Sequence, residues 1–178
     1  MLTSGIDFIN FKIKKSSPLV RKRLVALLKS KNEVVNSLSE NFKNSYKKKF
    51  LQKYKNKSNY RVIGMGGSSL GTQTIYDFLK HKIRKSFVFS DNLNADLVKE
   101  KKKYTNLIIS KSGNTIETIV NANILIKKKD KNIFITENKN SYLYNLAEKL
   151  KADIIHHNNY IGGRYSVLSE VGMLPAEL

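Results

Sequence analysis

The feature that most constrains the fold is an alternation, beginning at Tyr60, between short apolar runs and longer segments with helical periodicity. The apolar runs, each bounded by turn residues, lie at 61–63, 87–89, 107–109, 133–135 and 153–155. The segments between them, at 69–80, 94–102, 115–128 and 141–150, carry apolar residues at helical spacing. Such an alternation predicts an α/β fold with a doubly wound, five-stranded parallel sheet. Helices should cover both faces, because parallel crossovers are right-handed and need covering layers.

The residues before this alternation predict a helical extension. Ser17-Pro18 is typical of a helix start, because serine is a good N-cap and proline at the first helical position lacks only an N–H that would have no partner. We expect an irregular arm at 1–15, a helix at 18–30 and a weaker helix at 33–54. The chain therefore divides into an extension at 1–57 and an α/β domain at 58–178.

The charge is strongly basic but does not indicate a nucleic-acid partner. The 178 residues include 33 Lys and Arg against 14 Asp and Glu, a net charge of +19. Five of the basic residues are arginines, the residue preferred for bidentate recognition of phosphates and bases, and few aromatic residues are interleaved as stacking platforms. We interpret the lysines as solvated, with nucleic-acid binding through the charge as the alternative. That alternative predicts an affinity that falls steeply with salt.

Other features favour a cytoplasmic protein. No apolar run approaches the roughly 18 residues of a membrane span, so no membrane partner is expected. The first residues lack the pattern of a secretory signal. The absence of cysteine excludes a disulfide framework, a thiolate nucleophile and a cysteine-based zinc site.

A glycine-rich loop, 64–71, follows the first predicted strand. A dinucleotide fingerprint would need glycine at position 69, where Ser69 stands, and a P-loop would need lysine where Thr72 follows. What remains is a backbone that a ligand can approach closely, with the hydroxyls of Ser68 and Ser69 at a helix N-terminus. The structural alternative is a tight turn with a serine cap.

A second loop, 110–118, follows the predicted strand at 107–109 and carries three hydroxyl groups, those of Ser110, Ser112 and Thr115. They surround a glycine just ahead of a helix, whose N-terminus adds free N–H groups and a positive dipole end. A phosphate monoester matches such a donor-rich cluster. The alternative is a capping motif with Glu117 in the first helical turn. Ligands of doubly wound sheets bind beyond the carboxyl ends of the strands, where the connection order reverses.

A third segment makes the pattern more specific. The hydroxyl loop resembles the S-x-S-G-x-T-x-E loop of sugar-isomerase (SIS) phosphosugar-binding domains. Residues 162–169 read G-G-R-Y-S-V-L-S, after G-M-G-G-S-S-L-G and S-K-S-G-N-T-I-E-T in that order. Together the three motifs resemble the glucose-6-phosphate isomerase family over about residues 60–178.

The resemblance implies a site and an activity. Its phosphate-binding positions correspond to Ser110, Lys111 (largely through its backbone), Ser112 and Thr115, its sugar-binding positions to Gly67 and Ser68, and its catalytic arginine to Arg164. That arginine would stabilise an enediolate as glucose 6-phosphate and fructose 6-phosphate interconvert in glycolysis and gluconeogenesis. The implied partner is a small sugar phosphate, with no cofactor and no metal, and the full-length protein would be a homodimer.

The sequence also departs from the family pattern. Family members are considerably longer, with a second SIS domain, and their glutamate base, ring-opening histidine and late lysine lie beyond this segment. We therefore expect the chain to be catalytically incomplete alone. His156 and His157 are expected to be surface histidines at a strand end, and Glu170 and Glu177 match no catalytic position. A phosphosugar-binding SIS regulatory module and a bifunctional phosphoglucose/phosphomannose isomerase are the alternatives.

Overall fold

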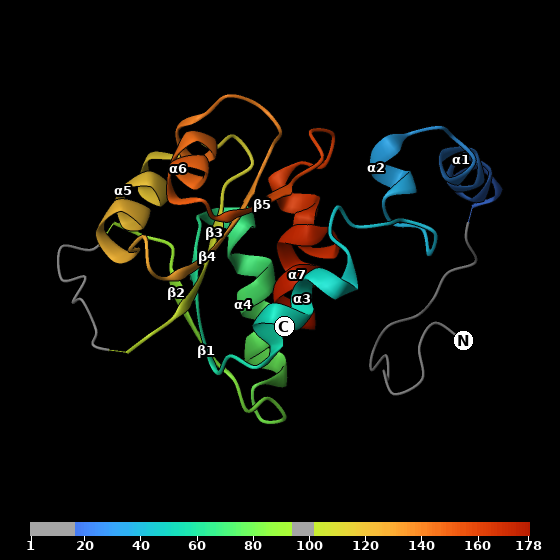
Figure 1. Ribbon diagram of the computed structural model, residues 1–178. Coiled ribbons are helices and arrows are strands. Elements are labelled where there is room, and N and C mark those ends of the chain that lie inside the picture. The colour runs from blue at the N-terminus through green and yellow to red at the C-terminus, as the bar shows by residue number, and fades with distance from the viewer. Residues whose placement is uncertain (1–16, 94–101) are drawn as a thin grey trace.

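The computed structural model describes residues 17–93 and 102–178. They form a five-stranded sheet in which every neighbouring pair is parallel, in the order β2-β1-β3-β4-β5. The strands are β1 (Asn59–Ile63), β2 (Ser86–Ser90), β3 (Thr105–Ile109), β4 (Lys131–Thr136) and β5 (Asp153–His156). The predicted fold class and all five predicted strands are confirmed (Figure 1).

Helices cover both faces of the sheet (Figure 1). One face carries α5 (Ile116–Leu125) and α6 (Tyr142–Leu150), and the other carries α3 (Lys48–Lys55), α4 (Leu70–Leu79) and α7 (Glu170–Glu177). Successive strand residues alternate between two buried clusters, because side chains of a strand point alternately to opposite faces. Val62 and Leu107 thus pack with α3 and α7, while Ile63 and Ile108 pack with α5 and α6.

The connection order reverses between β1 and β3. From β1 the chain runs to the edge strand β2 and then returns to β3, on the other side of β1. The loops that follow β1 and β3 therefore meet at one edge of the sheet, where a Cβ added to Gly64 would lie 2.9 Å from the carbonyl oxygen of Ile109. This is the point at which doubly wound sheets bind ligands.

The N-terminal helices differ from the prediction. Helix α1 (Pro18–Leu28) begins at Pro18 as expected, although the side chain of Ser17 makes no capping hydrogen bond. The prediction of a single helix at 33–54 is wrong, because α2 (Glu33–Asn36) and α3 are separate helices with turns between them. Ser and Asn are frequent in the intervening stretch, and their side chains compete for backbone groups. The Ser37 hydroxyl, for example, donates to the carbonyl of Val34 at 2.7 Å.

Only the last of these helices joins the core. Leu51 and Tyr54 of α3 are buried against the sheet, and the hydroxyl of Tyr60 in β1 donates to the carbonyl of Tyr54 at 2.7 Å. Helix α1 contains no buried residue. The apolar periodicity of residues 18–28 therefore forms a helix without forming a core contact.

The helices predicted at 69–80, 115–128 and 141–150 are confirmed with small shifts of their ends, as α4, α5 and α6. The helix expected at 115–128 ends at Leu125, where a turn follows in which Lys127 N–H donates to the Asp130 carboxylate at 2.8 Å. The arm at 1–15 and nearly all of the helix expected at 94–102 lie outside the described residues, and Lys102 itself is in a bend. Within 17–93 and 102–178, no helix is long and apolar enough to cross a membrane.

Candidate functional site

The glycine loop after β1 forms a short 3₁₀ helix, η1 (Gly66–Ser68), before α4 begins. Gly66 has a φ of +56°, a conformation that glycine adopts without strain. Ser69 is buried and its hydroxyl donates to the carbonyl of Gly66 at 3.3 Å, with no capping bond to α4. Ser68 is half-buried. Of the two serines in this loop, Ser68 is therefore the one accessible to a ligand.

The glycine loop packs directly against the segment that carries Arg164. This segment is a 3₁₀ helix, η2 (Gly163–Leu168), and a Cβ on Gly67 would lie 2.2 Å from the carbonyl oxygen of Gly163. The hydroxyl oxygen of Ser166 lies 3.1 Å from the carbonyl oxygen of Gly67 and 2.6 Å from that of Gly163. The close backbone contact and this shared hydroxyl fix the two motifs relative to each other.

In the loop after β3, the three hydroxyl groups lie together. Thr115 Oγ1 is 3.0 Å from Ser110 Oγ and 3.4 Å from Ser112 Oγ. Ser110 is buried, whereas Ser112 is exposed and Thr115 half-buried. Helix α5 begins directly after Thr115, so the unpaired N–H groups of its first turn and its positive dipole end lie beside the hydroxyls. The cluster suits a ligand with several acceptor oxygens.

The backbone of this hydroxyl loop is fixed from the side of α6. Gly113 has a φ of +68°, and a Cβ there would lie 2.0 Å from Ser141 Oγ, so the position needs glycine. The Gly113 carbonyl accepts from Leu143 N–H at 3.0 Å, and the Asn114 side chain accepts from Tyr142 N–H at 2.9 Å. The N-terminus of α6 thus holds the loop in place.

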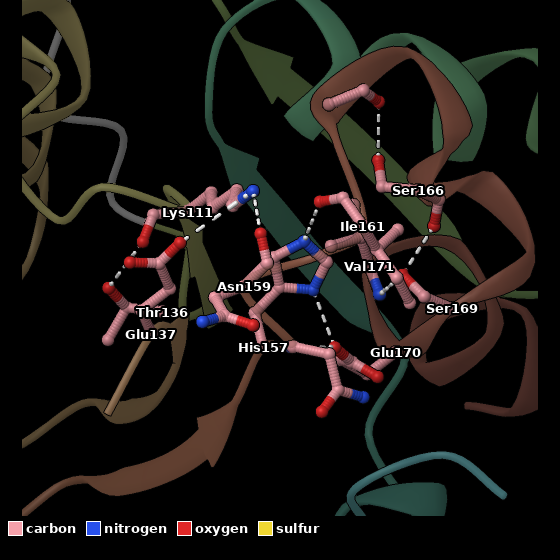
Figure 2. A network of polar contacts seen from close by, with 12 residues as sticks. Lys111, Thr136, Glu137, His157, Asn159, Ile161, Ser166, Ser169, Glu170 and Val171 are labelled. Carbon is pink, nitrogen blue, oxygen red and sulfur yellow. Dashed lines mark hydrogen bonds and ion pairs between the residues drawn. The ribbon is translucent and has the colours of Figure 1, made fainter. Parts of the chain in front are cut away.

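The side chain of Lys111 links the hydroxyl loop to the segment that precedes η2 (Figure 2). Its ammonium group donates to the carbonyl of Asn159 at 2.5 Å and lies 3.7 Å from Oε1 of Glu137. Because the ammonium group is already engaged, the expected role of Lys111 through its backbone is compatible with the structure. No sequence pattern indicated the contact with Asn159.

His157 is not the surface residue that the sequence predicts. It is buried, whereas His156 beside it is exposed at the end of β5 as expected. His157 Nδ1 lies 2.5 Å from Oε1 of the fully buried Glu170, and His157 Nε2 lies 3.2 Å from the carbonyl oxygen of Ile161 (Figure 2). The prediction is wrong because the tertiary fold supplies a carboxylate, at the N-terminus of α7, that makes burial of the imidazole favourable.

Arg164 lies exposed on η2. Its guanidinium forms no ion pair with any residue in the described parts of the chain. The η2 segment is fixed by its contact with Gly67, so this cation is carried by a rigid turn next to the glycine loop. The arginine is therefore placed where it can serve a ligand rather than a structural ion pair.

A doubly wound parallel sheet with these loops at its switch point defines an α/β domain of the SIS type. The fold is similar to that of a hypothetical protein from Thermus thermophilus, with a TM-score of 0.63 and 21% identity over 90% of this chain and 45% of that one. It is also similar to tagatose-6-phosphate ketose/aldose isomerase from Escherichia coli, with a TM-score of 0.50 and 16% identity over 66% of this chain and 36% of that one. The sequence profile of the phosphoglucose isomerase family matches residues 21–178, and the chain belongs to this family.

Curated relatives agree with this assignment. The chain is 38% identical over 149 residues to glucose-6-phosphate isomerase of Acholeplasma laidlawii. This alignment covers 71% of this chain and 35% of the relative. It is 38% identical over 141 residues to glucose-6-phosphate isomerase of Methanocaldococcus jannaschii, covering 70% of this chain and 34% of the relative. The chain thus spans about a third of the length of the relatives that it matches.

Proposed function

We propose that this chain supplies the phosphate site and one catalytic arginine of an aldose–ketose isomerase that interconverts glucose 6-phosphate and fructose 6-phosphate. The observation that carries the proposal is the cluster formed by the hydroxyls of Ser110, Ser112 and Thr115 at the N-terminus of α5. Membership of the phosphoglucose isomerase family supports the choice of substrate.

The chemistry of the cluster fits a phosphate monoester. Such a group carries about −1.5 to −2 charges at neutral pH and offers three acceptor oxygens. The exposed hydroxyl of Ser112, the half-buried hydroxyl of Thr115 and the N–H groups of the first turn of α5 can donate to these oxygens. The donors are neutral, which favours a substrate that must dissociate again. The net charge of +19 would raise the rate at which anionic substrates arrive.

In this proposal Arg164 stabilises the charge of the reaction intermediate, while Gly67 and Ser68 contact the sugar. In the open-chain aldose, a base removes the C2 proton and electron density moves onto the carbonyl oxygen at C1, which gives an enediolate. The hydroxyl proton on O2 passes to O1, and return of a proton to C1 then leaves the carbonyl at C2 and a hydroxyl at C1. A fixed guanidinium beside the developing oxyanion lowers the barrier to the first step.

The proposed site lacks a general base, and we propose that this chain alone turns over its substrate slowly or not at all. None of the residues assigned above, from the glycine loop to Arg164, is a suitable base, and the chain covers about a third of its relatives' length. General-base catalysis contributes about 10²–10⁴-fold to rate. For the whole protein we propose a cytoplasmic homodimer.

The experiment that tests the phosphate site is calorimetric titration of the chain with fructose 6-phosphate, with fructose and inorganic phosphate as comparisons. We expect saturable binding that prefers the phosphosugar and weakens about tenfold in Ser112→Ala and Thr115→Val, because each loses a hydrogen bond to a charged group. Ser39→Ala, at an exposed serine outside the site, is the matched control and should bind like the parent chain.

Two results would contradict the proposal. Fructose 6-phosphate binding that is unaffected by both hydroxyl variants would place the phosphate elsewhere. Turnover between glucose 6-phosphate and fructose 6-phosphate by this chain alone, at the rate of an intact isomerase, would disprove its catalytic incompleteness. Mannose 6-phosphate, tested beside glucose 6-phosphate on the whole protein, separates the bifunctional alternative.

A further inference from the structure

A cavity of about 580 Å³ lies at the amino ends of β1, β3 and β4. It is at the opposite edge of the sheet from the glycine and hydroxyl loops, which follow the carboxyl ends of β1 and β3. Its volume is within the range of small-molecule sites. The described residues that line it include six lysines: Lys57, Lys102, Lys103, Lys127, Lys129 and Lys131. None of the motifs assigned above contributes to it.

The floor of the cavity includes buried polar residues. Arg61, Asn106 and Asn132 occupy equivalent positions of β1, β3 and β4 in the sheet register, and all three are buried. Asn106 Nδ2 donates to Asn132 Oδ1 at 2.8 Å, while Asn106 Oδ1 is buried without a hydrogen-bond partner. Arg61 and Asn106 both line the cavity. This edge of the sheet is therefore built from polar groups where a parallel sheet usually has aliphatic ones.

Arg61 is the informative residue because its charge is buried without a carboxylate. The residue as a whole is only 7% exposed, Nη1 donates to the carbonyl of Leu125 at 3.3 Å, and the guanidinium lies 4.2 Å from the centre of the Tyr104 ring. No acidic side chain in the described parts of the chain is within ion-pair distance of it. Buried charges in proteins are ordinarily paired.

The charge around Arg61 is one-sided. The six lysines of the lining are exposed at its rim, and Asp130 is the single acidic residue among the described residues of the lining. The Asp130 carboxylate already accepts from Lys127 N–H at 2.8 Å. The cavity thus combines a buried guanidinium, which can bind a phosphate group bidentately, with exposed ammonium groups.

We infer that this cavity binds a small anion with two or more phosphate groups, at a site separate from the proposed sugar-phosphate site. One phosphate pairs with Arg61 at the floor, and further phosphates lie among the rim lysines. A single phosphate of about −2 would leave most of the seven cationic groups unbalanced.

The test uses inorganic tripolyphosphate as the probe, titrated calorimetrically into the chain at about 0.15 M salt, where surface attraction is screened. We expect one saturable site per chain. Arg61→Gln should weaken binding about tenfold or more, because it removes a charge-assisted hydrogen bond at the floor. Lys129→Glu, at the rim, should weaken it about threefold to tenfold. Lys149→Glu makes the same charge change on α6, away from the cavity, and should have less than about a twofold effect.

The comparison of the two charge reversals decides the proposal even if Arg61→Gln fails to fold. An equal loss in Lys129→Glu and Lys149→Glu would show that the probe responds to net charge alone, and would overturn the proposal. The absence of a saturable site at about 0.15 M salt would also overturn it. Orthophosphate binding as tightly as tripolyphosphate would contradict the requirement for more than one phosphate group.

Discussion

The backbone of Gly67 lies so close to that of Gly163 that a Cβ on Gly67 would be 2.2 Å from the Gly163 carbonyl oxygen and 2.4 Å from its carbonyl carbon. The atoms that an alanine side chain at position 67 would meet belong to the backbone, so Gly67→Ala must displace the backbone and cannot be accommodated by moving a flexible side chain. We expect a loss of about 1–3 kcal/mol of stability, measured by urea unfolding, together with weaker binding of fructose 6-phosphate.

The same substitution at the other glycine of this pair, Gly163→Ala, is the matched control. A Cβ on Gly163 would meet only the Cα of Gly67, at 4.0 Å, which is an ordinary contact. Gly163→Ala should therefore cost clearly less stability than Gly67→Ala. Equal destabilisation by the two variants would show that the close approach is not what constrains this pair.

The buried pair of His157 and Glu170 should stabilise the segment that leads to Arg164. Glu170 Oε1 also accepts from Asn158 N–H at 3.3 Å, so one carboxylate oxygen holds both a side chain and the backbone. Glu170→Ala leaves these donors buried without an acceptor, and we expect a loss of about 3–5 kcal/mol in urea unfolding. Glu148→Ala, on the exposed surface of α6, should change stability by less than about 0.5 kcal/mol. A small effect of Glu170→Ala would contradict this role.

The stability of the chain should fall at alkaline pH. Burial raises the pKa of the Tyr60 phenol from its ordinary 10.0 to about 12, and burial and the hydrogen bond to Asp153 raise the pKa of Tyr54 in the same direction. The contribution of the protonated Tyr60 phenol to the free energy of unfolding is thus fully present below pH 10 and is lost as the pH rises from 10 through 12. Lys85 has the opposite effect on the pH dependence. Burial lowers the pKa of its ammonium group, so burying the charged form costs stability at neutral pH, and this cost disappears as the pH rises to the ordinary pKa of 10.5.

Tyr60→Phe isolates this effect. The variant keeps the ring that stacks on Phe87 but loses the hydrogen bond to the Tyr54 carbonyl, at a cost of about 1 kcal/mol near neutral pH. Its free energy of unfolding should then fall less steeply between pH 10 and 12 than that of the parent chain. Tyr142→Phe, at an exposed ring, is the control. Parallel alkaline profiles for Tyr60→Phe and the parent chain would contradict the prediction.

The core contribution of α3 can be tested against α1. Leu51 is fully buried against the sheet, so Leu51→Ala should cost about 2–5 kcal/mol in urea unfolding. Leu24 of α1 is 53% exposed, and Leu24→Ala should change stability by less than about 0.5 kcal/mol. Equal effects would mean that α1 has a packing partner.

The proposed division at residue 57 predicts that a chain starting at residue 58 folds. Such a chain would lack Leu51 and Tyr54, which are buried in the core, so its folding is a strict test of the division.

The sequence was sufficient for the fold class and for the local elements of the candidate site. Short apolar runs such as 107–109 and 133–135 alternate with helical segments, and that periodicity is a local property of the chain. The glycine and hydroxyl loops were recognisable because glycine is needed where the backbone takes a positive φ, and this requirement depends only on the nearest residues in the chain. Gly113, with its positive φ, is an example.

Only the tertiary structure decided which distant groups meet. His157 became a core residue because Glu170 is brought against it, and Arg61, predicted only as part of a strand, became a buried cation because the sheet register sets it beside Asn106. The helix expected at 33–54 broke into α2 and α3, of which only α3 packs on the sheet. Hydrophobic periodicity specifies which residues seek burial, but long-range packing and charge pairing determine which groups they meet there.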